Sequence, residues 1–244
     1  MHEFVMVGFW WAREEDAQSC ARRCLRMFSA LSEIHPVFHG WQFYDEENER
    51  WIPFFDPLEI SELTSWVIDG ITRFDDGRIS PKQGYTFAAS TAGQSHGARV
   101  IIRAGAFGKM PIPNRVSMTI HHSDKADPLI SYRTVKAIML AVAEVWDVDW
   151  SWSAPFRFPT DYGDGPKRSF HAAWVTYLSA PFAKNILPPR SAVIERQANG
   201  GLLLAATKEN FDTANPAHVA ATEDILACLA PALPVLQKSA ADPP

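Results

Sequence analysis

The sequence predicts an α+β protein in which antiparallel sheet, of roughly seven to eight strands in total, packs with about four helices. Strand patterns occur in blocks rather than singly between helices. In residues 98–105 and 114–121 apolar and polar side chains alternate, which is typical of antiparallel strands with one buried face. The dipeptide Asn199-Gly200 lies between two further strand patterns and predicts a tight hairpin turn, because these residues supply positive φ angles.

The length and composition are sufficient for one large folded unit. Of the 244 residues, 47% are hydrophobic and 21% are charged, which is ordinary for a globular protein. A chain of this size buries enough surface to need no disulfide, and its three cysteines lack the spacing of a redox or zinc motif. We therefore expect a single domain over residues 1–238 and a loose tail over 239–244.

The first half of the chain begins with a predicted strand and helix. Residues 3–11 are rich in valine and aromatic residues, which favour a strand. Residues 14–34 repeat apolar side chains at helical spacing, and acidic residues in the first turn complement the helix dipole. A second helix is expected over 57–70, with Asp56 as its N-cap. Strand patterns follow at 85–90, 98–105 and 114–121.

The second half begins with a strong helix pattern over residues 129–146, whose apolar side chains share one face. Proline, glycine and charged residues over 155–169 predict a loop. The remaining expected elements are extended structure at 150–152, a strand over 171–179, the hairpin around Asn199-Gly200 and a helix from about 216 to 230.

Charge is distributed unevenly along the chain. Residues 1–76 hold 15 acidic and 6 basic side chains, a net charge of −9, whereas the remaining 168 residues hold 13 acidic and 17 basic side chains, a net charge of +4. An acidic first third repels nucleic acid and attracts basic partners. No apolar run approaches the ~20 residues of a membrane span. We therefore expect neither a nucleic-acid nor a membrane partner, and a cytoplasmic location.

The stretch VWDVDWSW at residues 145–152 contains the strongest candidate for a metal site. Asp147 and Asp149 have the D-x-D spacing that often binds a metal ion. In such a site, His121 or His122 would supply a further ligand. The competing interpretation is that Asp147 is a turn residue where a helix ends. A metal-dependent hydrolase or transferase using these side chains is therefore the alternative function, although the sequence carries no catalytic or cofactor motif.

The ordered motifs of this chain resemble those of immunity protein 52, a family of antitoxins from bacterial polymorphic toxin systems. The likeness starts with aromatic-A-R-E at residues 11–14 and continues through C-A-x-R, HPVFHGW and WDVDW. It then includes TYL, GGLLLAAT and NPAHVAA before the last helix. Val148 departs from the expected proline of W-D-P-D-W.

The resemblance implies a protein that acts by binding and catalyses no reaction. Members of the family look like inhibitors of nuclease toxins with a restriction-endonuclease-like fold, often delivered by contact-dependent or type VI secretion. By this interpretation the partner is a cognate nuclease toxin, no cofactor is needed, and VWDVDWSW is a structural connection between a helix and a strand.

We expect the toxin to contact acidic residues of the first third together with a nearby tryptophan, because nucleases are commonly basic. The excess of aromatic residues also leaves open a structural subunit of a larger assembly. The candidate partner-binding residues are Trp41, Asp45, Glu46, Glu47, Glu49, Trp51, Glu59, Glu62, Asp75 and Asp76.

Overall fold

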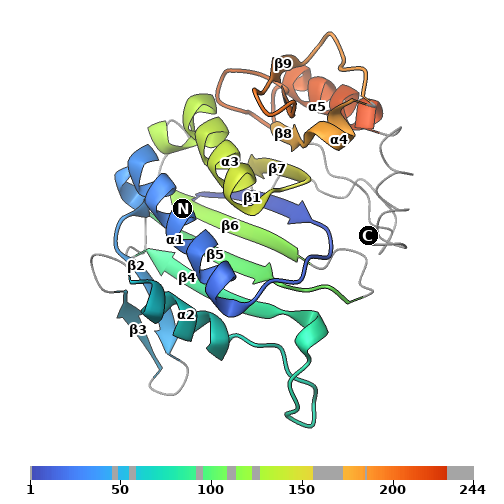
Figure 1. Cartoon of the computed structure of the whole chain (residues 1–244). Coiled ribbons are helices and arrows are strands. Elements are labelled where there is room, and N and C mark those ends of the chain that lie inside the picture. Colours follow the sequence, from blue (N-terminus) through green and yellow to red (C-terminus); the bar gives the residue numbers. More distant parts are fainter. Residues whose placement is uncertain are drawn as a thin grey trace.

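The computed structural model of the protein describes residues 2–45, 49–54, 59–91, 96–108, 114–122, 127–155, 173–184 and 186–229. Within these residues ten strands form one antiparallel sheet in the order β3-β2-β4-β5-β6-β1-β7-β8-β10-β9 (Figure 1). The strands are β1 His2–Trp10, β2 Trp41–Asp45, β3 Arg50–Pro53, β4 Tyr85–Thr91, β5 Gly97–Ala104, β6 Asn114–His122, β7 Trp150–Pro155, β8 Val175–Leu178, β9 Val193–Arg196 and β10 Leu202–Ala205.

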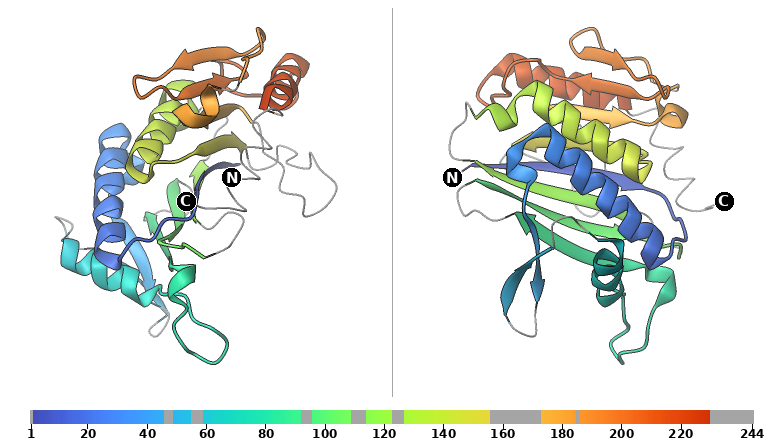
Figure 2. Two further views of the ribbon diagram at one scale, coloured as in Figure 1. Left: turned by 45° about the vertical axis from the view of Figure 1, so that its right-hand side comes forward. Right: turned by 60° about the vertical axis from the view of Figure 1, so that its left-hand side comes forward.

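The helices of the described residues form two unequal layers. The α-helices are α1 Ala17–Ile34, α2 Ile60–Asp69, α3 Tyr132–Trp146, α4 Ala180–Ala183 and α5 Pro216–Leu229. Short 3-10 turns lie at η1 Pro36–Phe38, η2 Pro81–Gln83 and η3 Pro128–Ile130. Helices α1, α2 and α3 cover one face of the sheet, whereas α4 and α5 lie on the other face beside β7, β8 and β10 (Figure 2).

Strand β1 lies in the middle of the sheet and is bonded on both sides. It pairs with β6 over its full length, from His2 opposite His122 to Trp10 opposite Asn114, and with β7 on its other edge. Its side chains alternate between the two layers because successive residues of a strand point to opposite faces. Phe4 and Met6 enter the core beneath α1 and α3, and Val7 faces the smaller core beneath α4 and α5.

The α+β class and the antiparallel sheet are confirmed, and the number of strands is higher than expected. The two additional strands are β2 and β3, which form a hairpin in the aromatic segment over 37–55. Aromatic side chains favour strands, but charged residues interrupt the alternation in this segment and conceal it. The five α-helices of the described residues include the short α4, which carries no periodic signal because it has only four residues.

Several element boundaries differ from the sequence prediction. Helix α1 begins at Ala17 rather than at residue 14, because Asp16 is the N-cap and accepts a hydrogen bond from the Ser19 N–H. Helix α2 begins at Ile60, and its N-cap Glu59 makes no side-chain capping bond. The predicted N-cap Asp56 and the tail over 239–244 lie outside the described residues, as does the predicted loop over 155–169 apart from Pro155.

The predicted hairpin is present, but its connection is longer than a two-residue turn. The last pair of the β9–β10 ladder joins Arg196 to Leu202. Gly200 has a φ of +82°, whereas Asn199 is not among the described residues with positive φ. The Asn199 side chain instead accepts a hydrogen bond from the Gly201 N–H at 2.9 Å. A short polar side chain therefore fixes the turn by bonding the backbone two residues on.

Gly70 is required where α2 ends against β4. The Thr86 N–H donates to the Gly70 carbonyl at 2.7 Å, and a Cβ on Gly70 would lie 2.3 Å from the Thr86 carbonyl oxygen. We expect Gly70→Ala to lower the free energy of unfolding by about 3 kcal/mol, the upper end of the range for overpacking. Urea denaturation followed by circular dichroism measures this change.

Gly77→Ala is the matched control, because Gly77 has a φ of +83° but no atom within 4 Å of the added Cβ. That substitution is expected to cost about 1–2 kcal/mol through backbone strain alone. A cost for Gly70→Ala no larger than that for Gly77→Ala would contradict the proposed steric contact.

Candidate partner-binding surface

A hollow of about 910 Å³ opens at the β2–β3 end of the sheet. It lies between the β2–β3 hairpin, the C-terminal end of α2 and strands β4 and β5. Concave sites of this size are typical of places where proteins receive a ligand or a partner's side chain. The lining residues that point to a function are Tyr44, Asp45, Trp51, Asp69 and Arg99.

The hollow exists because strands β2 and β4 diverge. Their ladder runs from Trp41 opposite Thr91 to Phe43 opposite Ala89 and then stops, although β2 continues to Asp45. Beyond that point the start of β4 bonds to the segment after α2 instead, through an isolated bridge between Ile71 and Tyr85. The β2–β3 hairpin therefore separates from the sheet.

Two aromatic side chains form one wall of the hollow. Tyr44 and Trp51 are directly opposite in the β2–β3 ladder, and their ring centroids lie 5.3 Å apart. Tyr44 is 45% exposed and Trp51 is 44% exposed, whereas most tryptophans of the described residues are buried. Exposed aromatic residues beside a hollow are typical of interface residues that contribute most of the binding free energy.

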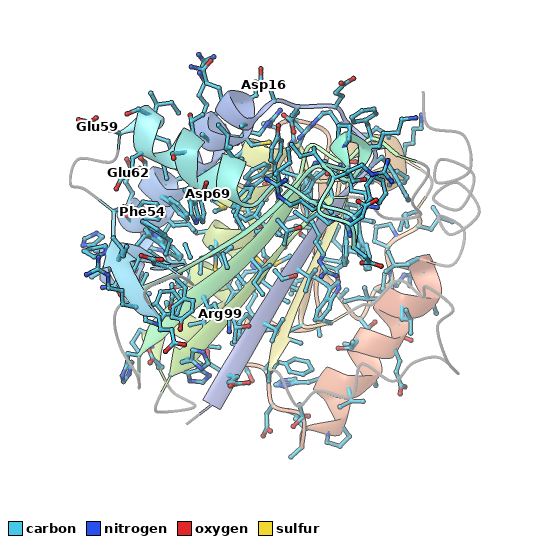
Figure 3. All side chains as sticks on the ribbon, turned by 90° about the horizontal axis from the view of Figure 1, so that it is seen from below. Asp16, Phe54, Glu59, Glu62, Asp69 and Arg99 are labelled. Carbon is cyan, nitrogen blue, oxygen red and sulfur yellow. The ribbon has the colours of Figure 1, made fainter. Side chains whose placement is uncertain are left out.

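The charged lining residues lie on different sides of the sheet. Asp69 is the last residue of α2 and is exposed, and Asp45 ends β2 and is half-buried. Arg99 lies on the face of the sheet opposite to α2, with an exposed side chain (Figure 3). The negative charge of the hollow therefore gathers on the side of α2.

The structure distributes the predicted acidic residues over the surface around α2. Glu59 and Glu62 lie at the start of that helix, as Figure 3 shows. Asp75 and Asp76 are exposed in the segment that follows the end of that helix. Glu49 is exposed at the start of β3, next to Arg50. Two further predicted residues, Glu46 and Glu47, lie outside the described residues.

The two predicted tryptophans have different environments. Trp41 is 4% exposed and stacks on Phe28, with ring centroids 4.6 Å apart, so it belongs to the core and offers no surface to a partner. Trp51 and the predicted Asp45 both line the hollow. The structure thus brings together Asp45 and Trp51 of the predicted residues.

Sequence reasoning missed three residues of the hollow, namely Tyr44, Asp69 and Arg99. The alternation in Trp41–Asp45 is the signal that Tyr44 points away from the buried Trp41. Nothing in the sequence places Arg99 at the same hollow as the end of α2, because the two belong to elements joined only by the sheet.

Asp147 ends helix α3 and has a structural role. Its φ of +49° is left-handed, and its carboxylate accepts hydrogen bonds from Arg13 at 3.1 Å and pairs with Arg23 at 3.0 Å. The same two guanidinium groups donate to the carbonyls of the last turn of α3, Arg13 to Trp146 and Arg23 to Val145. This arrangement supports the interpretation of Asp147 as a turn residue.

Asp149 is held by the backbone of the neighbouring strand. Its carboxylate accepts hydrogen bonds from the Trp11 N–H at 3.2 Å and the Ser179 hydroxyl at 3.4 Å. Burial raises the pKa of Asp149 to about 6, because the charged form loses hydration, and the two hydrogen bonds offset only part of this effect.

The structure does not assemble the alternative metal set. The Asp149 N–H bonds to Phe9 at one end of β1, whereas His121 and His122 pair with residues at the other end. Seven residues of strand separate these ends, about 23 Å. Within the described part of the chain, no group of three or more histidine, cysteine, aspartate or glutamate side chains is placed to hold a metal ion.

None of the helices that the structure describes has both the length and the apolar character required to cross a membrane.

Comparison with known proteins identifies the family of the chain and a solved structure with a similar fold. The sequence model of the family Imm52, immunity protein 52, matches residues 3–236. Among solved structures, the fold is similar to that of Pseudomonas aeruginosa T6SS protein PA0821, with a TM-score of 0.50 and 12% sequence identity. This similarity covers 92% of the chain and 73% of that protein, and it concerns the fold alone. No curated protein sequence matches the chain significantly.

The raised pKa of Asp149 gives a testable dependence of stability on pH. Between the unfolded pKa of 3.8 and the folded pKa of about 6, the folded state retains a proton that the unfolded state has lost. The stabilisation is complete below the lower value and is lost as pH rises to the upper value. An asparagine at this position cannot titrate, so we expect the Asp149→Asn variant to lack this pH-dependent loss of stability. Its free energy of unfolding relative to that of the natural protein should therefore rise by on the order of 2 kcal/mol between pH 4 and pH 7.

Chemical denaturation at several pH values measures this difference. Glu144→Gln is the control, because Glu144 is an exposed carboxylate five residues earlier in the chain. A difference between Asp149→Asn and the natural protein that stays constant from pH 4 to pH 7 would contradict the prediction.

Proposed function

Because the chain belongs to the immunity protein 52 family, we propose that it is an antitoxin that binds and neutralises a cognate nuclease toxin of restriction-endonuclease-like fold. The match of residues 3–236 to that family is the observation that carries the proposal. The toxin would be delivered by a type VI or contact-dependent system, and the antitoxin would protect the producing cell from within its cytoplasm. The fold similarity to a Pseudomonas aeruginosa T6SS protein supports the type VI route.

Neutralisation by binding requires a surface that recognises a nuclease, and the charge of this chain suits that task. Nucleases grip a polyanion and are commonly basic. The first 76 residues carry a net charge of −9, and they include β2, β3 and α2 around the hollow. Opposite charge accelerates association to ~10⁸–10⁹ M⁻¹s⁻¹ in steered pairs. A fast encounter is useful because a nuclease damages the cell from the moment it arrives.

Slow dissociation requires apolar contact in addition to charge. Exposed Tyr44 and Trp51 supply it beside the acidic residues, on a hairpin that belongs to the large sheet. Aromatic anchors surrounded by polar residues are the usual centres of tight interfaces. The proposed interface therefore combines the acidic residues Asp45, Glu46, Glu47, Glu49, Glu59, Glu62, Asp75 and Asp76 with Trp51.

The alternative, a metal-dependent hydrolase or transferase, has less support. It requires Asp147, Asp149 and His121 or His122 in one site, but the aspartates and the histidines lie at opposite ends of β1. Asp147 and Asp149 are instead engaged by arginine side chains and by the Trp11 backbone. A binding protein is therefore the better account of these residues.

The proposed function predicts protection in cells. We expect the gene next to that of this chain to encode a toxin with a C-terminal nuclease domain. This domain, expressed alone, should arrest growth, and co-expression of this chain should restore growth and yield a complex that co-purifies in equal proportions. Arrest that persists despite soluble, folded chain would contradict the proposal. A catalytically inactive nuclease variant is the control for the growth arrest.

The acidic surface makes a second prediction. Simultaneous reversal of Asp45, Glu46, Glu47 and Glu49 to lysine should weaken toxin binding by at least about tenfold at low salt and flatten its dependence on salt, because fewer favourable charges remain to be screened. Surface plasmon resonance at several salt concentrations measures both effects. The control reverses four distant acidic residues, which gives the same net charge: Glu144, Glu209, Glu223 and Asp224. Equal affinity of both variants at low salt would remove the β2–β3 hairpin from the interface.

A further inference from the structure

No described helix covers strands β2, β4 and β5 on the face of the sheet opposite to α2. Helices α1, α2 and α3 lie on the other face, and α4 and α5 lie beside β7, β8 and β10 (Figure 2). Trp41 in β2 stacks on Phe28 of α1, so Tyr44, three positions further on, points away from the helices, as does its cross-strand neighbour Trp51. Both rings are therefore exposed to a partner that approaches from this side.

Strand register continues this surface across the sheet. Ala88 in β4 lies directly opposite Ile101 in β5. Both point away from the helices, because the residues on either side of each along its strand belong to the core beneath α1 and α3. Together with the Tyr44 and Trp51 rings, these two side chains line the hollow. They form an apolar row that runs across the strands.

Arginine side chains lie on both sides of this apolar row. Arg99 precedes Ile101 by two residues and Arg103 follows it by two, so all three point to the same face. A strand rises ~3.4 Å per residue, which places the arginines about 7 Å from the row on either side. Arg115 in β6 lies directly opposite Arg103. None of the side chains that β4, β5 and β6 direct to this face is acidic. We call this surface the arginine face; it consists of Tyr44, Trp51, Arg99, Ile101, Arg103 and Arg115.

The positive charge of the arginine face is only partly compensated within the described residues. Elsewhere in the chain, Arg13 and Arg23 pair with carboxylates at the end of α3. Arg99 and Arg115 are exposed and form no ion pair with the acidic side chains that the structure describes. Burial and, second, the charge of Arg115 lower the pKa of Arg103, as expected for like charges directly opposite in a ladder. A carboxylate supplied by a partner would offset this repulsion.

The chemistry of the arginine face suits an acidic protein segment better than a nucleic acid. Arginine and aromatic side chains also bind single strands of nucleic acid. However, Asp45 and Glu49 lie on the hairpin that borders the face, and the first 76 residues carry a net charge of −9. These charges repel a polyanion along its length, whereas a protein segment can place a few carboxylates on the arginines alone.

We propose that the arginine face docks an acidic segment of a protein partner, in which an apolar side chain lies between two carboxylates. The apolar side chain packs on the row, and the carboxylates pair with the arginines on either side. In an extended segment, alternate side chains point the same way and lie about 7 Å apart. The pattern acidic-x-apolar-x-acidic therefore matches the spacing of Arg99, Ile101 and Arg103.

The identity of that partner as a nuclease toxin rests on the proposed function, whereas the preference of the arginine face for an acidic segment does not. A basic toxin that presents such a segment would find charge of opposite sign on both sides of the β2–β3 hairpin. Its basic surface would face the acidic residues around α2, and its acidic segment would face the arginines. Complementarity of both signs fixes the orientation of a complex.

The test uses the full chain and a small probe, the peptide acetyl-Glu-Ser-Leu-Ser-Glu-amide. Binding is followed by NMR through the backbone N–H signals of β4 and β5 and the indole N–H signal of Trp51, which is assigned by its loss in Trp51→Phe. The peptide should shift these signals in a saturable manner. The peptide with glutamine in place of both glutamates should bind at least about tenfold more weakly, because it keeps the shape but not the charge.

Substitutions on the arginine face should act on the same probe. Arg99→Gln is expected to weaken binding of the acidic peptide at least about fivefold, and Arg115→Gln should act in the same direction, because each removes a charge-assisted contact. The matched control Arg26→Gln removes an exposed arginine of α1, on the other side of the sheet, and should leave binding unchanged. Melting temperatures within about 3 °C of the natural protein establish that each variant is folded.

Three results would overturn the inference. The first is the absence of a saturable shift, or equal binding of the glutamate and glutamine peptides. The second is unchanged binding in folded Arg99→Gln. The third is a short oligothymidylate that shifts the same signals and binds more tightly than the acidic peptide, which would make the arginine face a nucleic-acid surface.

The failure of this inference and that of the proposed function give different results. If the chain neutralises the toxin but the arginine face does not prefer the acidic peptide, the docking inference is overturned and the antitoxin proposal stands. If the face binds the acidic peptide selectively but the chain fails to neutralise the neighbouring nuclease, the docking inference is supported and the antitoxin proposal falls.

Discussion

The structure depends on the insertion of β1 between β6 and β7. The first strand of the chain pairs with residues more than 100 positions away on both of its edges. These pairings join the meander β4-β5-β6 to the strands β7, β8, β10 and β9, so a single sheet of ten strands results. Without β1, the two groups of strands would each have an open edge, and α1 and α3 would lose the surface they cover together.

A second constraint fixes the connection between the helical layer and the sheet. The segment after β1 carries Arg13, and α1 carries Arg23; both reach the last turn of α3 and the Asp147 carboxylate. Helix α3 leads directly into β7, and β7 pairs with β1. This cluster of charges therefore links the segment after β1 to the segment before β7. The tryptophans around it serve this packing, as in the stacked rings of Trp10 and Trp146, 5.1 Å apart.

The candidate site lies where these constraints weaken. The β2–β3 hairpin joins the sheet through three residue pairs and then diverges from it, which leaves aromatic and acidic side chains without a protein layer of the described residues over them. A hairpin on a large sheet is a suitable platform for binding, because the sheet holds the groups rigid while their side chains stay exposed. The proposed recognition surface therefore lies at the β3 end of the sheet, whereas the VWDVDWSW stretch connects α3 to β7 and contributes to stability.

The sequence alone determined the class of the protein, most of its helices and strands, and its family resemblance, because periodicity, capping and turn residues act over short distances. It also established that acidic charge gathers in the first third of the chain. Only the tertiary structure decided that Trp41 is buried while Trp51 is exposed, since both occur in similar aromatic surroundings in the sequence. Likewise, which strands are neighbours in the sheet decides that Asp69, Tyr44 and Arg99 line one hollow and that Asp149 lies far from His121. Strand order is set by the packing of distant segments, and no local pattern encodes it.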